Sequence, residues 1–351
     1  MRSGRRRRGG VVLQVPGLYG PRQPLPLRAH PLPGESTGSF VNRLAHANGL
    51  GLADFLQRVG QGVGSSSGDA ARVEKYPQYT EMYVNQAGLE YLAVLAGAPA
   101  AVLQRALPGL APRHRLPGDG DAVWKWPWQP SEGHLVRCCT RCAEVRGVRE
   151  PAWWLVSDSW RVCARHQLWC DDSRTEPQGG LSLKELPEVV AAHLERARLK
   201  RQFGRSGEEL FADAFQVAAD WWRSMPMVLR WVHRAWACGL EDRSIRVMPL
   251  VVYPEAAQLA QLMLQFEQSD VRDRDACGRW LGKAEALMES WDLDVQAGRG
   301  PLLDWLHRHR APSDAEAQPA ARTRRVRLPL APGHSRLASP TGTLEARSGL
   351  S

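Results

Sequence analysis

The sequence predicts a mainly α-helical protein with one small zinc-ribbon-like module, and three observations lead to this fold class. Apolar residues recur at helical spacing in both halves of the chain. Pro, Gly and Ser residues stand where helices begin and end. Five of the seven Cys residues lie between residues 138 and 170, a clustering typical of a metal site. A chain of 351 residues is long enough for two or three domains.

Two short helices are expected first. Ser36 or Ser39 can cap the first helix, and Asn48-Gly49 can end it. A Gly/Ser loop is expected from Gly60 to Gly68. The apolar faces of the two helices are formed by Phe40, Val41, Leu44 and Ala45, and by Leu52, Phe55, Leu56 and Val59.

Residues 86–107 predict a helix–turn–helix pair. Gly97 supplies the turn, and Pro99 presets the backbone for the second helix. A helix that reads DNA bases needs polar side chains on its outer face, and residues 100–107 offer only Gln104 and Arg105. The pair is therefore interpreted as a packing or partner-docking unit in preference to a base reader.

Helices are also predicted after residue 187. Pro187 suits a first helical position, and Ser206 and Glu209 form a capping box. A further helix is expected to begin after Pro226 and another at Pro254. The buried sides of these helices are expected to include Phe211, Ala214, Phe215, Ala218, Trp222, Trp231, Leu259, Leu262 and Met263.

The predicted organisation has five parts. They are a disordered basic tail (1–24), an N-terminal helical part (25–115), a zinc-binding module (116–180), a C-terminal helical domain (181–310) and a second disordered basic tail (311–351). Residues 108–131 form a Pro/Gly-rich connector that ends in Trp124, Trp126 and Trp128.

The net charge of +9 is concentrated in the two tails. Residues 1–10 carry +5 and residues 311–351 carry +3, so the body between them is close to neutral. The bulk charge is thus weak support for nucleic-acid binding by the folded surface. Arg greatly outnumbers Lys, which suits phosphate contacts, although a GC-rich genome would produce the same bias.

The strongest motif is a pair of metal-binding knuckles. Cys139 and Cys142 form a C-x2-C pair, and Cys163 and His166 follow as C-x2-H after 20 intervening residues. Two intervening residues let a tight turn aim both side chains at one ion, and two such turns complete a tetrahedral Zn²⁺ shell. Because protein ligands fill all four positions, the expected zinc is structural and not catalytic.

Other residues of the module have less specific interpretations. Cys138 and Cys170 could compete for the metal, but the symmetric pairing uses neither. Trp153, Trp154, Trp160 and Trp169 could stack on nucleic-acid bases. Filling the core of a small module is the commoner use of such residues, and we expect it here.

No catalytic motif was identified. The sequence lacks G-x-S-x-G, a P-loop and H-E-x-x-H. The acidic pairs Asp119/Asp121 and Asp171/Asp172 are typical of solvated turns. We therefore expect a non-enzymatic protein. The absence of an apolar export segment after Arg8 favours a cytoplasmic location.

Two stretches resemble the TniQ family. The first runs from Pro31-Leu32-Pro33-Gly34-Glu35-Ser36 through Arg43-Leu44-Ala45 to Asn48-Gly49-Leu50. The second pairs the Arg-led C-x2-C at residues 137–142 with Trp160-Arg161-Val162-Cys163 and His166. The resemblance covers roughly residues 25–172, and the family's further Cys pair is missing after Cys170.

The resemblance implies an accessory protein of transposition, which bridges a targeting complex to the transposition machinery and is not the recombinase. Nucleic acid, DNA in the first instance, and proteins of that machinery are the implied partners. The oligomeric state stays open, with a homodimer as one alternative. A stand-alone DNA-binding transcriptional regulator, using the helix–turn–helix and the zinc module, is the competing interpretation.

Overall fold

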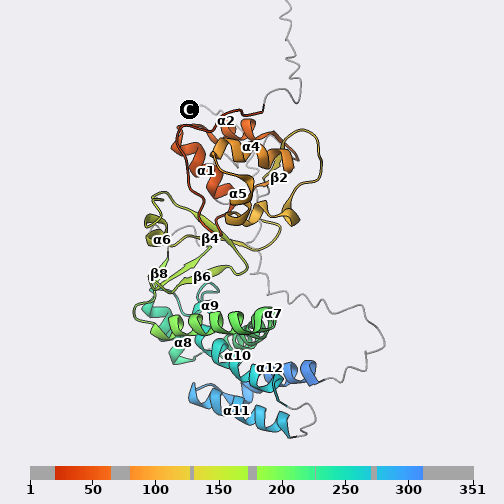
Figure 1. Cartoon of the computed structure of the whole chain (residues 1–351). Coiled ribbons are helices and arrows are strands. Elements are labelled where there is room, and N and C mark those ends of the chain that lie inside the picture. The colour runs from red at the N-terminus through yellow and green to blue at the C-terminus, as the bar shows by residue number, and fades with distance from the viewer. Residues whose placement is uncertain are drawn as a thin grey trace, which may run out of the picture. The chain divides into compact units, whose positions relative to one another are not determined.

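The computed structural model describes residues 20–64, 80–126, 130–172, 180–225, 227–269 and 275–310 (Figure 1). The chain divides into two compact units, Met1–Ser182 and Leu183–Ser351. The described residues are mostly helical and include a few small sheets in the first unit, which confirms the mainly α class. Both predicted basic tails fall largely outside the described residues.

Helices α1 (Thr37–Ala47) and α2 (Leu52–Val59) begin the first unit as predicted. Ser36 is the cap of α1, since its side chain accepts a hydrogen bond from the Ser39 amide at 3.0 Å. Asn48 ends the helix, and Gly49 follows with φ of 64°. The expected Gly/Ser loop is wrong at its start, because Gln61–Gly62 form strand β1.

Helices α4 (Gln86–Ala96) and α5 (Ala100–Ala106) occupy the predicted helix–turn–helix segment. Gly97 joins them in the left-handed conformation, with φ of 62°, and their axes differ by 97°. Whether this pair acts as a helix–turn–helix stays a prediction.

Among the described residues no single helix has the length and apolarity to cross a membrane. The bent α4–α5 pair meets the test of length and apolarity only when its two helices are taken together.

A small sheet closes this helical part. β2 (Tyr83–Val84) and β1 flank β3 (Val123–Lys125), which runs parallel to β1 and antiparallel to β2. The 3₁₀ turns η2 (Pro108–Leu110) and η3 (Pro112–His114) precede β3. The segment expected to be a plain connector therefore contributes the central strand of a sheet.

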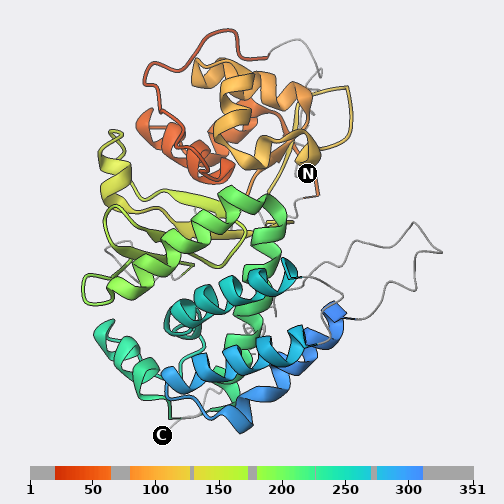
Figure 2. The same ribbon diagram turned by 60° about the horizontal axis from the view of Figure 1, so that its bottom comes forward.

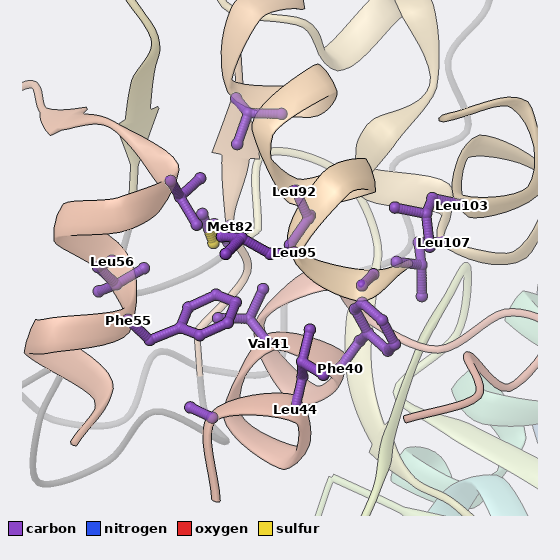
Figure 3. Packing of buried hydrophobic residues seen from close by; sticks show 14 of the residues in the cluster. Phe40, Val41, Leu44, Phe55, Leu56, Met82, Leu92, Leu95, Leu103 and Leu107 are labelled. Carbon is purple, nitrogen blue, oxygen red and sulfur yellow. The ribbon is translucent and has the colours of Figure 1, made fainter. Parts of the chain in front are cut away.

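One hydrophobic cluster forms the core of the helical part (Figure 3). Every helix named so far contributes, and Met82 joins from the segment before β2 with no exposed surface. The labelled residues of the cluster are Phe40, Val41, Leu44, Phe55, Leu56, Met82, Leu92, Leu95, Leu103 and Leu107. The helical periodicity seen in the sequence thus points into a single shared core.

The Cys-rich module consists of two antiparallel sheets and one short helix. β4 (His134–Arg137) pairs with β5 (Trp153–Val156), and helix α6 (Thr140–Glu144) follows β4. β6 (Trp160–Cys163), β7 (Leu168–Asp171) and β8 (Leu181–Ser182) form the second sheet in that order. The connection from β4 to β5 includes α6, whereas β6 and β7 form a tight hairpin, and Cys139, Cys142, Cys163 and His166 lie in or next to these two connections.

The start of α1 is bonded to the edge of β5. The Ser36 amide donates to the Trp153 carbonyl at 2.8 Å, and the Trp153 amide donates to Ser39 Oγ at 3.0 Å. The Leu155 amide donates to the Gly34 carbonyl at 3.0 Å. This short segment therefore acts as an added strand that connects the helical part to the Cys-rich module.

The second unit is all-helical in the described residues (Figure 2). Its longest helix, α7 (Pro187–Ser224), packs along α10 (Tyr253–Glu267). Two helices meet within α7 at a kink at Gly204, whose φ of 57° suits glycine, and the capping box predicted at Ser206 falls two residues after this kink. The other helices are α8 (Leu229–Ala237), α9 (Met248–Val251), α11 (Ala276–Ser290) and α12 (Val295–Arg310).

Candidate metal centre

The structure brings Cys139, Cys142, Cys163 and His166 together in one cluster. Cys139 caps α6, and Cys142 lies on the first turn of that helix. Cys163 ends β6, and His166 lies in the turn that leads to β7, where Gln167 adopts a φ of 51°. Each x2 spacing therefore corresponds to one tight turn, as the knuckle pattern predicts.

The interatomic distances fit a tetrahedral site. All four ligand atoms lie within 4.8 Å of one another. His166 Nδ1 is 3.4 Å from Cys139 Sγ, 3.2 Å from Cys142 Sγ and 3.5 Å from Cys163 Sγ, and the Cys142 and Cys163 sulfurs are 3.6 Å apart. Bonds of about 2.3 Å to sulfur and about 2.0 Å to nitrogen would separate tetrahedral ligand atoms by roughly 3.5–3.8 Å. The cluster could thus hold a metal ion.

Burial keeps the cluster from acting as a reactive thiol site. Loss of solvation raises the pKa of Cys139 to about 12 and also raises the pKa of Cys142. A nucleophilic or redox Cys requires a lowered pKa. Thiols with raised pKa values, such as those of Cys139 and Cys142, ionise readily only when a cation compensates their charge, which is the behaviour of metal ligands.

Cys138 and Cys170 lie outside the four-residue cluster. Both are buried, and both belong to the small hydrophobic core of the module together with Leu32, Val136 and Trp154. Burial is also the main cause of the raised pKa of each thiol. These two cysteines act as small apolar residues in the core.

The aromatic residues of the module are core residues. Trp153, Trp154, Trp160 and Trp169 are each at most 7% exposed. The rings of Trp160 and Trp169 stack with centroids 4.6 Å apart and planes 16° from parallel. No face of these rings is open enough for a base to stack on it, so the expected core role describes them better than base stacking.

Two buried carboxylates near the module were not singled out by the sequence. Glu35 forms a two-pronged ion pair with Arg43, at 2.8 Å from Nε and 2.7 Å from Nη2, and also accepts a hydrogen bond from Ser39 Oγ at 2.8 Å. Both partners of the pair are at most 5% exposed. The Glu-Ser step and the Arg-Leu-Ala core of the N-terminal motif are therefore the two sides of one buried ion pair.

The second buried carboxylate, Glu81, meets the start of α1. Its Oε1 accepts from the amides of Gly38 at 3.2 Å and Met82 at 2.7 Å. Burial raises the pKa of Glu81 to about 7 despite these bonds. A carboxyl group in contact with a helix N-terminus is favourable, and no local sequence pattern reveals that residue 81 reaches residue 38.

Comparison with known proteins assigns the first unit. No curated protein and no solved structure matches the chain significantly. The TniQ family model matches residues 26–169, a range that begins before α1 and includes all four residues of the cluster. Residues 26–169 therefore carry a TniQ domain, and this match supports the TniQ family for that part of the chain.

Proposed function

We propose that this protein is a non-enzymatic, zinc-binding adaptor that associates with nucleic acid and with the target-selection machinery of a transposon. The observation that carries the proposal is the match of residues 26–169 to the TniQ family. That range contains the complete Cys/His cluster, so the feature with the most specific chemistry lies inside the assigned domain.

Zinc is the metal we propose for Cys139, Cys142, Cys163 and His166. Three thiolates and one imidazole favour Zn²⁺ over hard cations such as Mg²⁺. Four protein ligands leave no open position for an activated water, so the ion would be structural. When bound, it would cross-link the β4–α6 turn to the β6–β7 turn and hold both sheets of the module together.

The adaptor role also concerns partners and location. Members of the TniQ family act in transposition complexes, which suggests nucleic-acid and protein partners for this chain. We propose DNA as the nucleic acid, bound in part through the Arg-rich segments at 1–24 and 311–351. A cytoplasmic location goes with this proposal, because clustered thiols persist in a reducing compartment.

The proposal is tested by transposition itself. If a transposase and a transposition ATPase are encoded next to its gene, the chain would be co-expressed with them, and insertion into a target plasmid would be counted. We expect insertion to require the chain and to be lost in Cys139→Ser and Cys163→Ser. Unchanged insertion without the chain, or the absence of any transposition gene nearby, would contradict the adaptor role.

A stand-alone transcriptional regulator is the second candidate, and the α4–α5 pair is the observation that favours it. Footprinting at physiological salt separates the two candidates. A discrete protected site favours the regulator. Weak binding without a footprint, falling steeply with salt, is expected of the adaptor.

A further inference from the structure

A small pocket lies beside the Cys/His cluster, and its charge is unlike that of the rest of the body. The pocket has a volume of about 300 Å³, at the lower end of the range for ligand sites. Its apolar wall is formed by Leu32, Pro33 and Trp154. Three arginines, Arg146, Arg161 and Arg165, also line it, and no carboxylate contributes. Cys142 and Cys163 of the cluster form the side of the pocket next to the candidate metal centre.

None of these three guanidinium groups forms an ion pair within the described part of the chain. Arg146 donates only to the Cys142 carbonyl, at 3.4 Å. Arg161 lies over the ring of Trp154, 4.1 Å from its centroid. All three residues are exposed. Other arginines of the described residues, such as Arg43 and Arg234, have carboxylate partners.

The stacking of Arg161 prepares it for an anion. A guanidinium that packs over an aromatic ring can still direct N–H groups at two oxygens of a phosphate. Contact with Trp154 restricts Arg161, so less side-chain freedom is lost on binding. Arg146 lies in the turn that follows α6, and Arg165 lies beside His166 in the turn between β6 and β7.

The positive charge of the pocket persists when the metal is counted. A Zn²⁺ ion with three thiolates has a net charge of about −1, which the three arginines exceed by two charges. The negative charge of the metal centre would therefore neutralise only part of the positive charge of the three arginines. A ligand with negative charge is needed to balance the remainder.

We propose that this pocket, the arginine pocket formed by Arg146, Arg161, Arg165 and Trp154, binds a backbone phosphate of nucleic acid. This inference rests on the proposed function, since it assigns part of the nucleic-acid contact to the folded body in addition to the Arg-rich tails. A phosphate fits better than a protein carboxylate, because several phosphates recur along one strand and can meet several guanidinium groups. Trp154 serves as the platform for Arg161 and is not available to stack on a base.

The test uses the full chain and a fluorescent 30-base-pair DNA duplex of mixed sequence. Affinity is measured between 50 and 200 mM salt for the wild type, for Arg161→Gln/Arg165→Gln, and for the matched control Arg141→Gln/Arg149→Gln. Both double variants remove two exposed positive charges from the same module, but only the first removes them from the pocket. Metal content and thermal unfolding of each variant show that the module is intact.

We expect the pocket variant to weaken binding about tenfold or more at 100 mM salt and to lower the salt slope by about 1 to 2, as loss of phosphate contacts does. The control should change affinity less than threefold. Equal weakening in both variants would overturn the pocket as a site and leave only general surface charge. Unchanged affinity in the pocket variant would overturn it too, while the proposed nucleic-acid association would stand.

Two further outcomes are distinguishable. If the wild-type chain does not bind the duplex at all, both this inference and the nucleic-acid part of the proposed function fail. A fluorescent hexaglutamate peptide tests the other class of partner. If the pocket variant loses the peptide but keeps the duplex, the pocket binds acidic protein and the assignment to nucleic acid is wrong.

Discussion

The helical part of the first unit buries eighteen residues in one hydrophobic cluster, whereas the cluster beside the Cys/His residues of the module contains nine within the described residues, with Trp153, Trp160 and Trp169 buried outside it. Three of those nine are cysteines, including the cluster residue Cys139. A small module gains less from burial than a larger one does, and has less with which to offset the conformational entropy of folding. The comparison teaches that neighbouring parts of one unit differ in construction: one has a large hydrophobic cluster, and the other has a smaller cluster beside four Cys/His side chains that could hold a metal ion.

The largest expected effect comes from removing one metal ligand. Cys142→Ser or His166→Ala should abolish binding of about one zinc per chain and unfold the module, because the binding free energy of such sites, on the order of 10 kcal/mol, is also folding free energy. Elemental analysis and the near-ultraviolet circular dichroism of the stacked Trp160 and Trp169 measure the two losses. Cys138→Ala is the matched control and should keep its zinc. Unchanged metal content in Cys142→Ser would remove the basis of the comparison.

The ion pair between Glu35 and Arg43 tests the junction of the two parts. Arg43→Ala leaves Glu35 buried without its partner, which should lower the free energy of unfolding by about 3–5 kcal/mol. Urea unfolding measures the loss. The double variant Glu35→Gln/Arg43→Met should recover much of it, since it removes the uncompensated charge. If the double variant were no more stable than Arg43→Ala, the charge would not be the cause.

Leu92 tests the helical core by itself. This side chain has no exposed surface, so Leu92→Ala should lower stability by about 3 kcal/mol through lost packing and a residual cavity. Metal content should stay at the wild-type value, in contrast to the ligand variants. A variant that lost zinc together with stability would show that the two parts unfold as one.

The smallest expected effect is the pH dependence due to Glu81. Its pKa is about 7 in the folded state against 4.5 as the ordinary value, so between these values the folded state binds more protons than the unfolded state. Stability should therefore fall as pH rises from about 4.5 to 7, by about 3 kcal/mol at most, and level off above that. Urea unfolding at several pH values measures the slope.

Glu81→Gln should flatten this slope and be the more stable protein at pH 8. The amide can still accept the Gly38 and Met82 bonds through its oxygen, and the Thr37 hydroxyl beside it lacks a hydrogen-bond partner. Glu90→Gln, at an exposed position, is the control and should keep the wild-type slope. An unaltered slope in Glu81→Gln would assign the pH dependence to another group.

The sequence by itself determined the local elements of this protein. Three local features depend only on residues a few positions apart, and the structure has all of them: the cap at Ser36, the helix end at Asn48-Gly49 and the turn at Gly97. Helical spacing likewise named the eight residues that α1 and α2 contribute to the buried cluster. The knuckle spacing named the four residues that the fold brings within 4.8 Å of one another. In each case the physical cause is contained in one turn of chain.

Only the tertiary structure decided the contacts between segments that are distant in the sequence. β1 pairs in parallel with β3. Part of the expected Gly/Ser loop is therefore a strand, and so is part of the expected Pro/Gly-rich connector. Glu81 reaches the start of α1, and three arginines, one from β6 and two from separate turns, line one pocket. Such contacts depend on how the chain is folded over its whole length, and short polar or Gly-rich segments carry no periodicity that would indicate them. The hydrogen bonds between the start of α1 and β5 are likewise contacts between distant segments. They join the helical part of the TniQ domain to its Cys-rich module.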